Sequence, residues 1–429
     1  MNAFRVASLT LLWFFLALLV VGALGLPISL DLVILLLLAL VSKLSIKVLY
    51  SNLVLLLVMV LLVIELPTRL IIDASTFYRP QDQFAEVPIF KEPSHQRRYL
   101  PNIKTDFQSP HGDLVAIGGA ETFQDYSHLV QARTVRFETD EHGYRNTPGS
   151  AQTAELVLVG DSFVEGVGLS QESTPASQIK TLFGVNAYSL AFPDDPPGYI
   201  RRLNESEAWL RPELPKIIFL FAGNDFQFSG ITESTAINQT SRLSNLLIKQ
   251  LGAKGAYTRL LYQRVGLRSP ALLNNIFMGL ISRGGSETQR ASKVVIKQWE
   301  MSQTDVVLYT PYLTNAAPTL SKNAKVQLTL TKEQRDTTSC LVLIPSKEQL
   351  YLGVNGGLGP ENPLLPVVTS DASLQPSIKK IDLLPLFIAS ARTNPSLPLF
   401  LSDDTHWTPD AVGLTVKHLR AQGCLEVRH

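Results

Sequence analysis

The first 72 residues consist almost entirely of apolar stretches separated by short polar connections. These stretches run from Ser8 to Leu26, from Ile28 to Val41 with Asp31 near its start, and from Val48 to Ile64. The first has close to the roughly 20 residues that a helix needs to cross a bilayer, and the third is uncharged and of similar length. The middle stretch is short enough to thin the bilayer locally or to be re-entrant. We therefore predict a transmembrane anchor of about three helices over residues 1–72.

Charged residues beside these stretches predict how the anchor is oriented. Lys43 and Lys47 follow the middle stretch, whereas the connection from Gly25 to Asp31 has no basic residue. The positive-inside rule then places the N-terminus and the loop with the two lysines in the cytoplasm, so three crossings leave everything after Leu70 on the outer side. A cleaved signal peptide is the alternative, but its basic region would be Arg5 alone and no convincing cleavage site follows.

From Glu155 onward the pattern changes to short, continuous apolar runs that alternate with helical stretches. Strands buried on both faces give such unbroken runs, and helices between them are typical of a parallel sheet covered on both sides. We therefore predict a three-layer α/β domain with its ligand crevice at the carboxyl ends of the strands. The predicted strands are Leu156–Val159, Ala187–Leu190, Ile217–Phe221, Val306–Tyr309, Leu341–Ile344 and Pro398–Leu401. The predicted helices are Thr174–Leu182, Ile200–Leu210, Ser241–Leu261 and Ala291–Ser302.

Polar and proline-rich sequence sets the limits of this domain. Prolines recur between residues 73 and 150 and break any long helix, which predicts an extracytoplasmic connector at 73–129 and a lead-in of short strands. The domain is predicted to cover residues 130–429, with a helical insertion at about 230–289 that is rich in Ser, Asn and Leu. The Gly-, Pro- and Ser-rich residues 353–380 predict a long loop.

Composition and charge narrow the class of function. The 38 basic and 37 acidic residues nearly cancel, and no basic run occurs, which argues against nucleic-acid binding. Cys340 and Cys424 are too few for a disulfide framework and lack zinc spacing. They form one bridge in an oxidising compartment or remain two buried thiols, and the sequence leaves both open. We predict no metal and no cofactor, because Asp161 and Asp225 stand beside Gly and Asn, where carboxylates mostly stabilise turns.

Two polar motifs directly follow predicted strands. Gly160-Asp161-Ser162 presents Ser162 at a strand end, where a nucleophile can face solvent from a rigid scaffold. Gly223-Asn224-Asp225 presents Asn224 in the same way, and its uncharged amide can donate to a negatively charged oxygen, as an oxyanion hole requires. The alternative for Asn224 is a side chain that only closes a turn.

A third motif near the C-terminus supplies the base that a serine nucleophile needs. In Asp403-Asp404-Thr405-His406, a carboxylate two or three residues before the histidine can orient the ring and hold it in one tautomer. Each motif alone is weak, but a serine, an asparagine and an aspartate-histidine pair, all at strand ends, form a consistent set. We therefore predict Ser162 as the nucleophile and His406 as the base.

With these residues the chain resembles the SGNH hydrolases, also called GDSL-type esterases, over roughly residues 130–425. Ser162 matches the nucleophile and first oxyanion donor of the family's first block, Asn224 the third block, and His406 the base of the fifth. The resemblance implies a flavodoxin-like α/β/α fold and an enzyme that hydrolyses or transfers acyl groups by a Ser-His-Asp mechanism. The stretch Phe137–Arg145 is also similar to the lead-in before the nucleophile in many bacterial members.

The acid that orients the histidine has two candidates. Family members commonly place it three residues before the histidine, which gives Asp403, whereas an Asp-x-His-Trp form gives Asp404. Of the two we favour Asp404. Asp404–Trp407 and Ile344–Glu348 are also similar to segments of the alginate-type O-acetyltransferases, which acylate exopolysaccharides in the periplasm. Trp407 either stacks on a sugar ring or packs in the core. Lys347 and Glu348 either contact substrate or form a surface ion pair, and we favour the ion pair.

The oxyanion hole implied by the resemblance departs from the family at one position. The second block has a glycine whose backbone N–H completes the hole, and Asp194 stands there in this chain. Either Gly198 serves instead, or a carboxylate stands beside the developing negative charge, which is unfavourable unless it points away. The predicted oxyanion hole is therefore Ser162, Asp194 and Asn224.

These expectations combine into a membrane-anchored serine esterase in the bacterial inner membrane, with its catalytic domain facing the periplasm. Its expected substrates are O-acyl groups, acetyl above all, on a cell-envelope or exported carbohydrate. A polysaccharide O-acetyltransferase is the first alternative. The second is a catalytically degenerate domain that acts as a binding or assembly subunit with envelope partners, and the departure at Asp194 is its support.

Overall fold

The computed structural model describes residues 81, 84–85, 98–118, 120–228, 293–299, 304–316, 324–359, 361–370 and 377–426. The predicted anchor of residues 1–72 and the predicted helix Ser241–Leu261 of the insertion lie outside these residues. In the part of the chain that is described, no helix is long and apolar enough to cross a membrane. All described residues belong to one compact unit.

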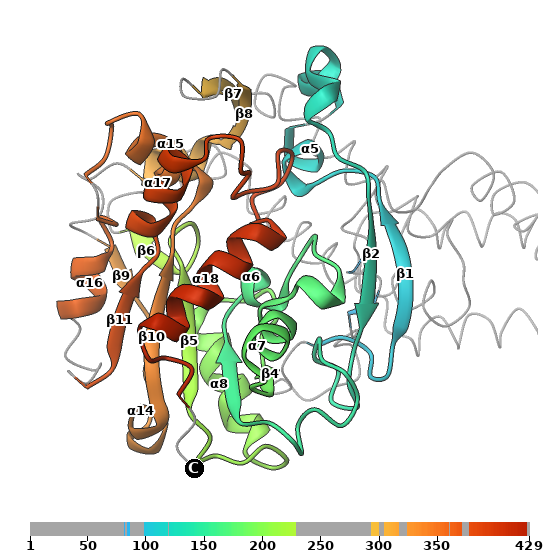
Figure 1. The fold of residues 1–429 in the computed structure, drawn as a ribbon, viewed down its shortest axis with the longest axis vertical. Helices are drawn as coiled ribbons and strands as arrows, with labels where there is room; N and C mark the ends of the chain where they lie inside the picture. Colours follow the sequence, from blue (N-terminus) through green and yellow to red (C-terminus); the bar gives the residue numbers. More distant parts are fainter. Residues whose placement is uncertain are drawn as a thin grey trace, which may run out of the picture. The chain divides into compact units, whose positions relative to one another are not determined.

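Five parallel strands form the central sheet of this unit (Figure 1). They are β3 (Leu156–Val159), β4 (Ala187–Ser189), β5 (Lys216–Phe221), β10 (Thr338–Ile344) and β11 (Lys379–Asp382), and they lie in the order β11-β10-β5-β3-β4. The chain adds β4 on one side of β3 and then crosses to β5 on the other side. The direction of winding therefore reverses between β3 and β5, which is where doubly wound sheets bind ligands. The predicted α/β class with a mostly parallel sheet is confirmed.

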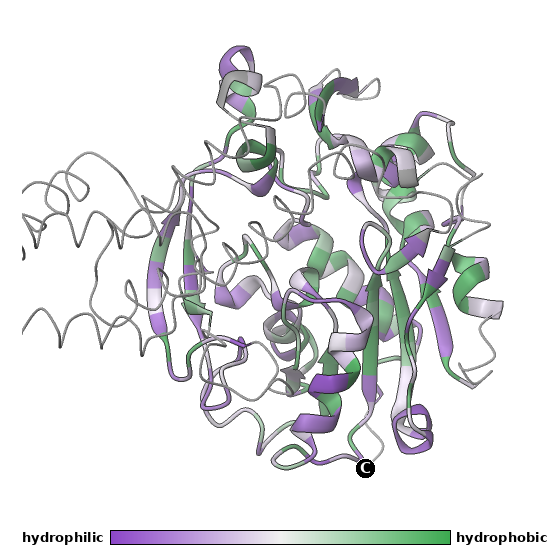
Figure 2. Ribbon diagram, turned by 180° about the vertical axis from the view of Figure 1, so that it is seen from behind, coloured by the Kyte–Doolittle hydropathy of each residue, from purple (hydrophilic) through white to green (hydrophobic). Residues whose placement is uncertain are grey.

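Helices cover both faces of the sheet. Successive strand residues point to opposite faces, so an unbroken apolar strand places apolar side chains on both of them. Leu156 and Leu158 belong to one buried cluster, whereas Val157 and Val159 belong to another. The unbroken apolar runs thus reflect burial on both sides, and Figure 2 shows central strands that are apolar over most of their length. The first cluster includes residues of α6 (Ser162–Glu165), α7 (Pro175–Phe183), α15 (Lys347–Val354), α17 (Leu384–Thr393) and α18 (Pro409–Ala421), and the second includes residues of α8 (Pro196–Ser206) and α16 (Leu365–Ser370).

Two predicted elements after the insertion differ from the structure. The predicted helix Ala291–Ser302 is wrong, because β7 (Val294–Trp299) is a strand that pairs antiparallel with β8 (Thr304–Tyr309). Its Val-Val-Ile start consists of β-branched residues, which favour extended backbone. The predicted strand Val306–Tyr309 is present as part of β8, but it lies in this two-stranded sheet and not in the central one.

The fifth central strand is β11, and the predicted strand Pro398–Leu401 is wrong. Phe400 forms only a single bridge, with Trp407. The predicted loop 353–380 is wrong in part, since it contains α16 and the start of β11. β11 has the sequence Lys-Lys-Ile-Asp, whose polar residues suit an edge strand. The remaining short elements are η6 (Gln171–Ser173), β6 (Phe226–Phe228), α12 (Thr310–Asn315), β9 (Ala324–Val326) and α14 (Lys332–Thr337).

Residues 98–138, which we call the lead-in, precede the central sheet and form their own antiparallel strand pair (Figure 1). β1 (Lys104–Ser109) pairs with β2 (Arg133–Glu138). Between these strands the chain forms α5 (Asp113–Gly118) and the 3-10 helix η5 (Ala120–Leu129). Apolar residues of α5 and η5 pack in one cluster with residues of β7 and β8.

Arg145 ties the lead-in to the loop that follows α6. Its side chain is 1% exposed, and its guanidinium lies 5.1 Å from the ring centroid of Phe137 on β2. The same guanidinium donates hydrogen bonds to the backbone carbonyls of Gly166 and Leu169. A planar group with several donors in a fixed geometry suits this task better than a lysine would.

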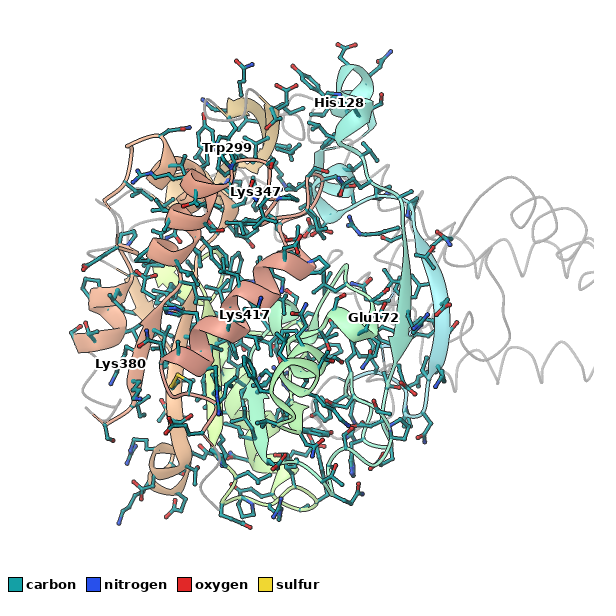
Figure 3. The ribbon with its side chains drawn as sticks, in the orientation of Figure 1. His128, Glu172, Trp299, Lys347, Lys380 and Lys417 are labelled. Atoms are coloured by element: carbon teal, nitrogen blue, oxygen red, sulfur yellow. A yellow bond between two sulfur atoms is a disulfide. The ribbon has the colours of Figure 1, made fainter. Side chains whose placement is uncertain are left out.

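A disulfide joins β10 to the segment after α18. Cys340 and Cys424 form one bridge across a sequence separation of 84 residues, with their Cα atoms 5.8 Å apart (Figure 3). The alternative of two buried thiols is therefore wrong. The bridge encloses α15, β11, α17, α18 and the motif that contains His406 in one covalent loop.

Candidate functional site

The candidate site lies at the carboxyl ends of β3 and β5, where the winding of the sheet reverses. Ser162 is the first residue of α6, so its backbone N–H has no acceptor within that helix. The side chain of Asp161 caps α6 by accepting from the N–H of Phe163 at 2.9 Å. Asp161 therefore stabilises the turn, as predicted, and the strand–turn–helix unit presents Ser162 at its tip.

A hydrogen-bonded chain runs from the serine through the histidine to an aspartate. Ser162 Oγ lies 2.8 Å from Nε2 of His406, and Nδ1 of His406 lies 2.6 Å from Oδ1 of Asp404. All three side chains are buried. An Nδ1–H that donates to Asp404 leaves Nε2 free to accept the serine proton, which is the tautomer that a general base needs.

Of the two candidate acids, the structure brings Asp404 to the ring and turns Asp403 toward the lead-in. The Asp403 carboxylate accepts hydrogen bonds from the backbone N–H of Gly112 at 2.7 Å and of Gln131 at 3.0 Å. It also accepts from Nη1 of Arg133 at 3.1 Å. Three donors from the lead-in thus hold Asp403, which anchors the segment that carries the base.

Arg133 binds both aspartates with one guanidinium. Its Nη2 donates to Oδ2 of Asp404 at 2.8 Å, beside its bond to Asp403. Burial by itself raises the pKa of Asp404, but the facing His406 ring and then Arg133 outweigh it and hold that pKa well below its usual range. Asp404 is therefore ionised at neutral pH and can stabilise a protonated His406.

Asn224 lines the same pocket as Ser162 and His406, and it is exposed. The neighbouring Asp225 closes the turn instead, since its Oδ2 accepts from the N–H of Phe221 at 2.7 Å. Burial and then the nearby Asp161 raise the pKa of Asp225 well above its usual range, which favours a neutral carboxyl group there. Asp225 therefore supplies the side chain that closes this turn.

Asp194 also lines the pocket, and its carboxylate is bound by a buried cation. Nη1 of Arg202 donates to Oδ2 of Asp194 at 2.8 Å. The alternative donor, Gly198, is engaged elsewhere, because its N–H donates to Oδ1 of Asp195 at 3.0 Å as part of the cap of α8. The N–H of Gly198 is therefore already engaged, and the charge of the Asp194 carboxylate is offset by Arg202.

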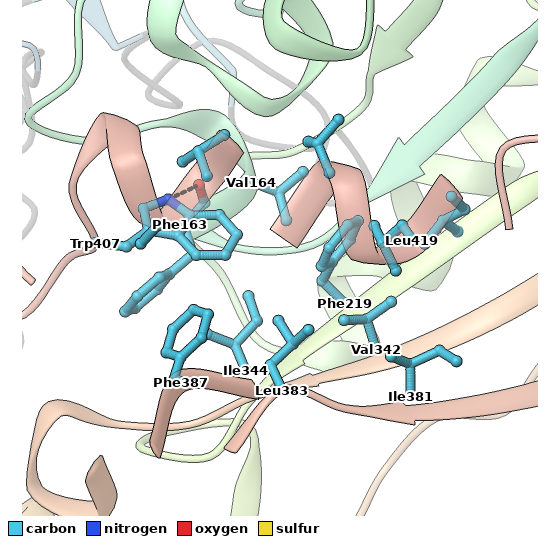
Figure 4. Packing of buried hydrophobic residues seen from close by; sticks show 14 of the residues in the cluster. Phe163, Val164, Phe219, Val342, Ile344, Ile381, Leu383, Phe387, Trp407 and Leu419 are labelled. Atoms are coloured by element: carbon cyan, nitrogen blue, oxygen red, sulfur yellow. Dashed lines mark hydrogen bonds between the residues drawn. The ribbon is translucent and has the colours of Figure 1, made fainter. Parts of the chain in front are cut away.

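The pocket above Ser162 has a volume of about 390 Å³ and a partly aromatic wall. Tyr309 and Tyr312, which sequence analysis did not identify, stand perpendicular to each other with ring centroids 4.8 Å apart. Trp407 is fully buried and donates from its indole N–H to the carbonyl of Phe163 at 3.1 Å (Figure 4). Of the two alternatives for Trp407, core packing is therefore correct, and the pocket tyrosines are the aromatic rings available to a substrate.

The expected surface ion pair of Lys347 and Glu348 is wrong, because both side chains are buried. Nζ of Lys347 donates to the carbonyls of Leu401 at 2.6 Å and Ser402 at 3.2 Å (Figure 3 labels Lys347). Glu348 accepts from the N–H of Tyr309 at 2.7 Å. The lysine thus holds the backbone just before the two aspartates, and the glutamate holds the strand that carries a pocket tyrosine.

Sequence reasoning also missed Asp113 and Arg133, which come from the lead-in. Asp113, Asp404 and His406 are a described set of side chains whose ligand atoms lie within 4.8 Å of one another, a spacing that a metal ion could bridge. In this structure Asp113 accepts from Thr405, Asp404 from Arg133, and both ring nitrogens of His406 have partners. Each of these three side chains therefore has hydrogen-bond partners within the protein, and the set belongs to one hydrogen-bonded network around His406.

Comparisons with known proteins give no match for this chain, neither to a family model nor to a curated protein or a solved structure.

Proposed function

We propose that this protein is a serine esterase or O-acyltransferase of the SGNH type. The observation that carries the proposal is the continuous chain of hydrogen bonds from Asp404 through His406 to Ser162. Asn224 at the end of the adjacent strand supports it. The strand order, counted along the chain from β3, is 2-1-3-4-5, which is the flavodoxin-like order that the family resemblance implies.

In the proposed reaction Ser162 Oγ attacks the carbonyl carbon of an ester, and its proton passes to Nε2 of His406. Asp404 stabilises the positive charge on the ring during this step. The tetrahedral intermediate collapses, the alcohol leaves with the proton from Nε2, and Ser162 carries the acyl group. Water or a sugar hydroxyl then attacks the acyl-enzyme and gives its proton to Nε2. When the acyl group departs, Ser162 Oγ takes this proton from Nε2, and the free serine and the neutral histidine are regenerated.

The negative charge of the intermediate needs donors aimed at it. The backbone N–H of Ser162, the N–H of Asp194 and the side-chain amide of Asn224 are the proposed donors. Loss of one such donor costs about 10²–10³ in rate in enzymes of this kind. The Arg202 bond keeps the Asp194 carboxylate paired, so that its charge opposes the intermediate less than a free carboxylate would.

The proposed substrates are O-acyl groups on cell-envelope or exported carbohydrate, with the catalytic domain on the outer side of the membrane. The apolar stretches within residues 1–72 and the charge bias around them support this location. The Cys340–Cys424 disulfide supports it independently, because such bridges persist mainly in oxidising compartments such as the periplasm. The pocket tyrosines suit a sugar ring, which often lies against an aromatic face.

The test is covalent labelling of the full-length chain with a fluorophosphonate probe, together with hydrolysis of an aryl acetate. We expect labelling at Ser162 and measurable turnover, both abolished by Ser162→Ala. Ser177→Ala on α7 is the matched control and should leave both unchanged, since Ser177 lies outside the pocket. A wild-type chain that is neither labelled nor active would overturn the proposal.

Hydrolase and transferase differ in what attacks the acyl-enzyme, so the products distinguish them. Release of acetate from an acetylated polysaccharide indicates hydrolysis, and acetylation of an oligosaccharide from an activated donor indicates transfer. The binding or assembly alternative loses its support at Asp194, because Arg202 offsets that charge.

A further inference from the structure

Asp113, the first residue of α5, lies behind the catalytic histidine although it belongs to the lead-in. Its side chain is buried. Oδ1 accepts from the backbone N–H of Thr405 at 2.9 Å, and Oδ2 accepts from the hydroxyl of Thr405 at 2.7 Å. Thr405 lies between Asp404 and His406 in the chain. Asp113 therefore binds the residue that connects the proposed acid and the proposed base.

The Asp113 carboxylate also faces the imidazole ring. Its Oδ2 lies 3.8 Å from Nδ1 of His406, just beyond the 2.6 Å bond that Asp404 makes to the same nitrogen. The backbone N–H of Asp113 donates to Oδ2 of Asp404 at 3.3 Å. Nδ1 is therefore faced by two carboxylates, one in direct contact and one a short distance behind it.

Charged groups gather around this ring. Asp113, Asp403 and Asp404 are the carboxylates of the two segments, and Arg133 donates to Asp403 and Asp404. Glu348 and these three aspartates all act on the buried Lys347. Both oxygens of Asp113 accept hydrogen bonds from Thr405. The imidazolium that forms in the proposed reaction would therefore stand among several carboxylates.

Other titratable groups also lie near the ring. Burial, with Asp113 and Glu348 adding to it, raises the pKa of Tyr309 and of Tyr312. Burial likewise raises the pKa of Glu348. Asp161 lines the pocket on the side of Ser162. Among the described carboxylates, Asp404 and Asp113 are the two that face Nδ1 of His406, at 2.6 Å and 3.8 Å.

We propose that Asp113 is a positioning residue of the catalytic base, which fixes the segment between Asp404 and His406 and adds a second negative charge facing the imidazolium. This inference rests on the proposed roles of Ser162 and His406. A lead-in residue would then hold the segment of the base across a sequence separation of 292 residues from Thr405.

The test compares Asp113→Asn with wild type in the full-length chain, with an aryl acetate as substrate. We expect kcat to fall by about 10- to 100-fold, the range set by losing one hydrogen bond to a charged group, while KM stays within about twofold. Removal of a negative charge disfavours the imidazolium, so the acid limb of kcat/KM should move to lower pH. Coulomb's law at this distance gives a move of at least about 0.8 pH unit even at the dielectric constant of water. An unmoved acid limb would overturn the proposal.

Two further variants separate position from charge. Thr405→Val removes the hydroxyl that Asp113 accepts but keeps every charge, so kcat should fall by about threefold to tenfold with the acid limb in place. This variant also tests the proposal if Asp113→Asn does not fold, since an unchanged kcat contradicts it. Asp382→Asn on β11 is the control for loss of a partly buried, hydrogen-bonded carboxylate outside the pocket and should leave both kcat and the acid limb unchanged.

Failure of this inference can be told from failure of the proposed function. If wild type shows no turnover, the proposed function has failed, and the titration midpoint of His406 in protein labelled with ¹⁵N-histidine replaces the kinetic readout. That midpoint should move to lower pH in Asp113→Asn whether or not the chain is an enzyme. If wild type is active and neither kcat nor the acid limb responds to Asp113→Asn, only the role of Asp113 is overturned.

Discussion

One buried lysine lies at the amino end of the central sheet and another at its carboxyl end. The two lysines differ in the charges around them. Lys216, the first residue of β5, donates from Nζ to the carbonyls of Pro212 at 2.6 Å and Leu214 at 3.0 Å and to the hydroxyl of Thr337 at 2.8 Å. These acceptors are all neutral. Burial lowers the pKa of Lys216 to about 8, opposed only by exposed glutamates.

Lys347, at the carboxyl end of the sheet, also donates to two backbone carbonyls but stands among acids. Burial lowers its pKa, and Glu348, Asp404, Asp113 and Asp403 act against that shift. The amino end of the sheet thus satisfies a buried cation with dipoles, whereas the carboxyl end assembles opposite charges. The buried charged groups of this fold therefore gather at the carboxyl end of the sheet, where the chemistry is proposed. Changes at the carboxyl end should therefore affect catalysis, and changes at the amino end should affect stability alone.

The largest expected effect is on activity at the carboxyl end. Ser162→Ala should lower kcat/KM for an aryl acetate by at least about 10⁴-fold, because the nucleophile is lost while the pocket remains. The melting temperature should stay within a few degrees of wild type. Steady-state kinetics and calorimetry on the same preparation check both parts, and a variant that loses stability instead of activity would break the comparison.

The largest effect on stability should come from the disulfide. Replacing both Cys340 and Cys424 with alanine should lower the free energy of unfolding by about 4.5 kcal/mol for a loop of 84 residues. Activity below the melting transition should persist, since neither residue lines the pocket. Denaturant unfolding with a parallel activity assay measures this, and a large loss of kcat in the folded variant would contradict the division between the two ends.

The two lysines give the most direct test of the comparison. Lys347→Met leaves three buried aspartates with Arg133 as their remaining cation, so it should cost roughly 3 kcal/mol and reduce kcat. Lys216→Met removes a cation that has no buried acid beside it and should change stability by only about 1 kcal/mol, with kcat unchanged. Equal losses of stability in Lys347→Met and Lys216→Met would show that burial, and not the surrounding charge, determines what each lysine contributes.

The amino end should also show a pH dependence of stability. Lys216 has a pKa of about 8 in the folded state and about 10.4 when unfolded, so the unfolded state binds more protons between these values. Stability should therefore rise with pH from about 8 to 10, by at most about 1.4 kcal/mol per unit for this one proton. Urea unfolding at several pH values should show a shallower rise in Lys216→Met than in wild type, and parallel curves would argue against it.

The predictions that agree best with the structure rest on residues that are neighbours in the chain. β3 and the turn that carries Ser162 follow from an unbroken apolar run before Gly-Asp-Ser, and His406 stands out from the other histidines by the aspartates before it. The predicted strand Ile217–Phe221 differs from β5 by a single residue. These signals depend on neighbours in the chain, which a reader of the sequence can see.

The residues that sequence analysis missed depend on distant partners. Arg133 reads as one position in a polar, alternating strand, and only the fold brings it to Asp403 and Asp404, 270 and 271 residues later. Lys347 resembled a surface residue because its local pattern is charged, yet the loop at 401–402 buries it. The polar edge strand β11 was missed because an edge strand needs pairing on one side only and little apolar sequence.

The large sequence separation between Ser162 and His406 has a consequence during synthesis of the chain. Ser162 and His406 lie 244 residues apart, so at about 5–20 residues per second a ribosome needs roughly 12 to 50 seconds to add the base after the nucleophile. If Ser162 is the nucleophile, as proposed, the growing chain carries it during that interval without the base that activates it. A chain that terminates before His406 would then have no esterase activity.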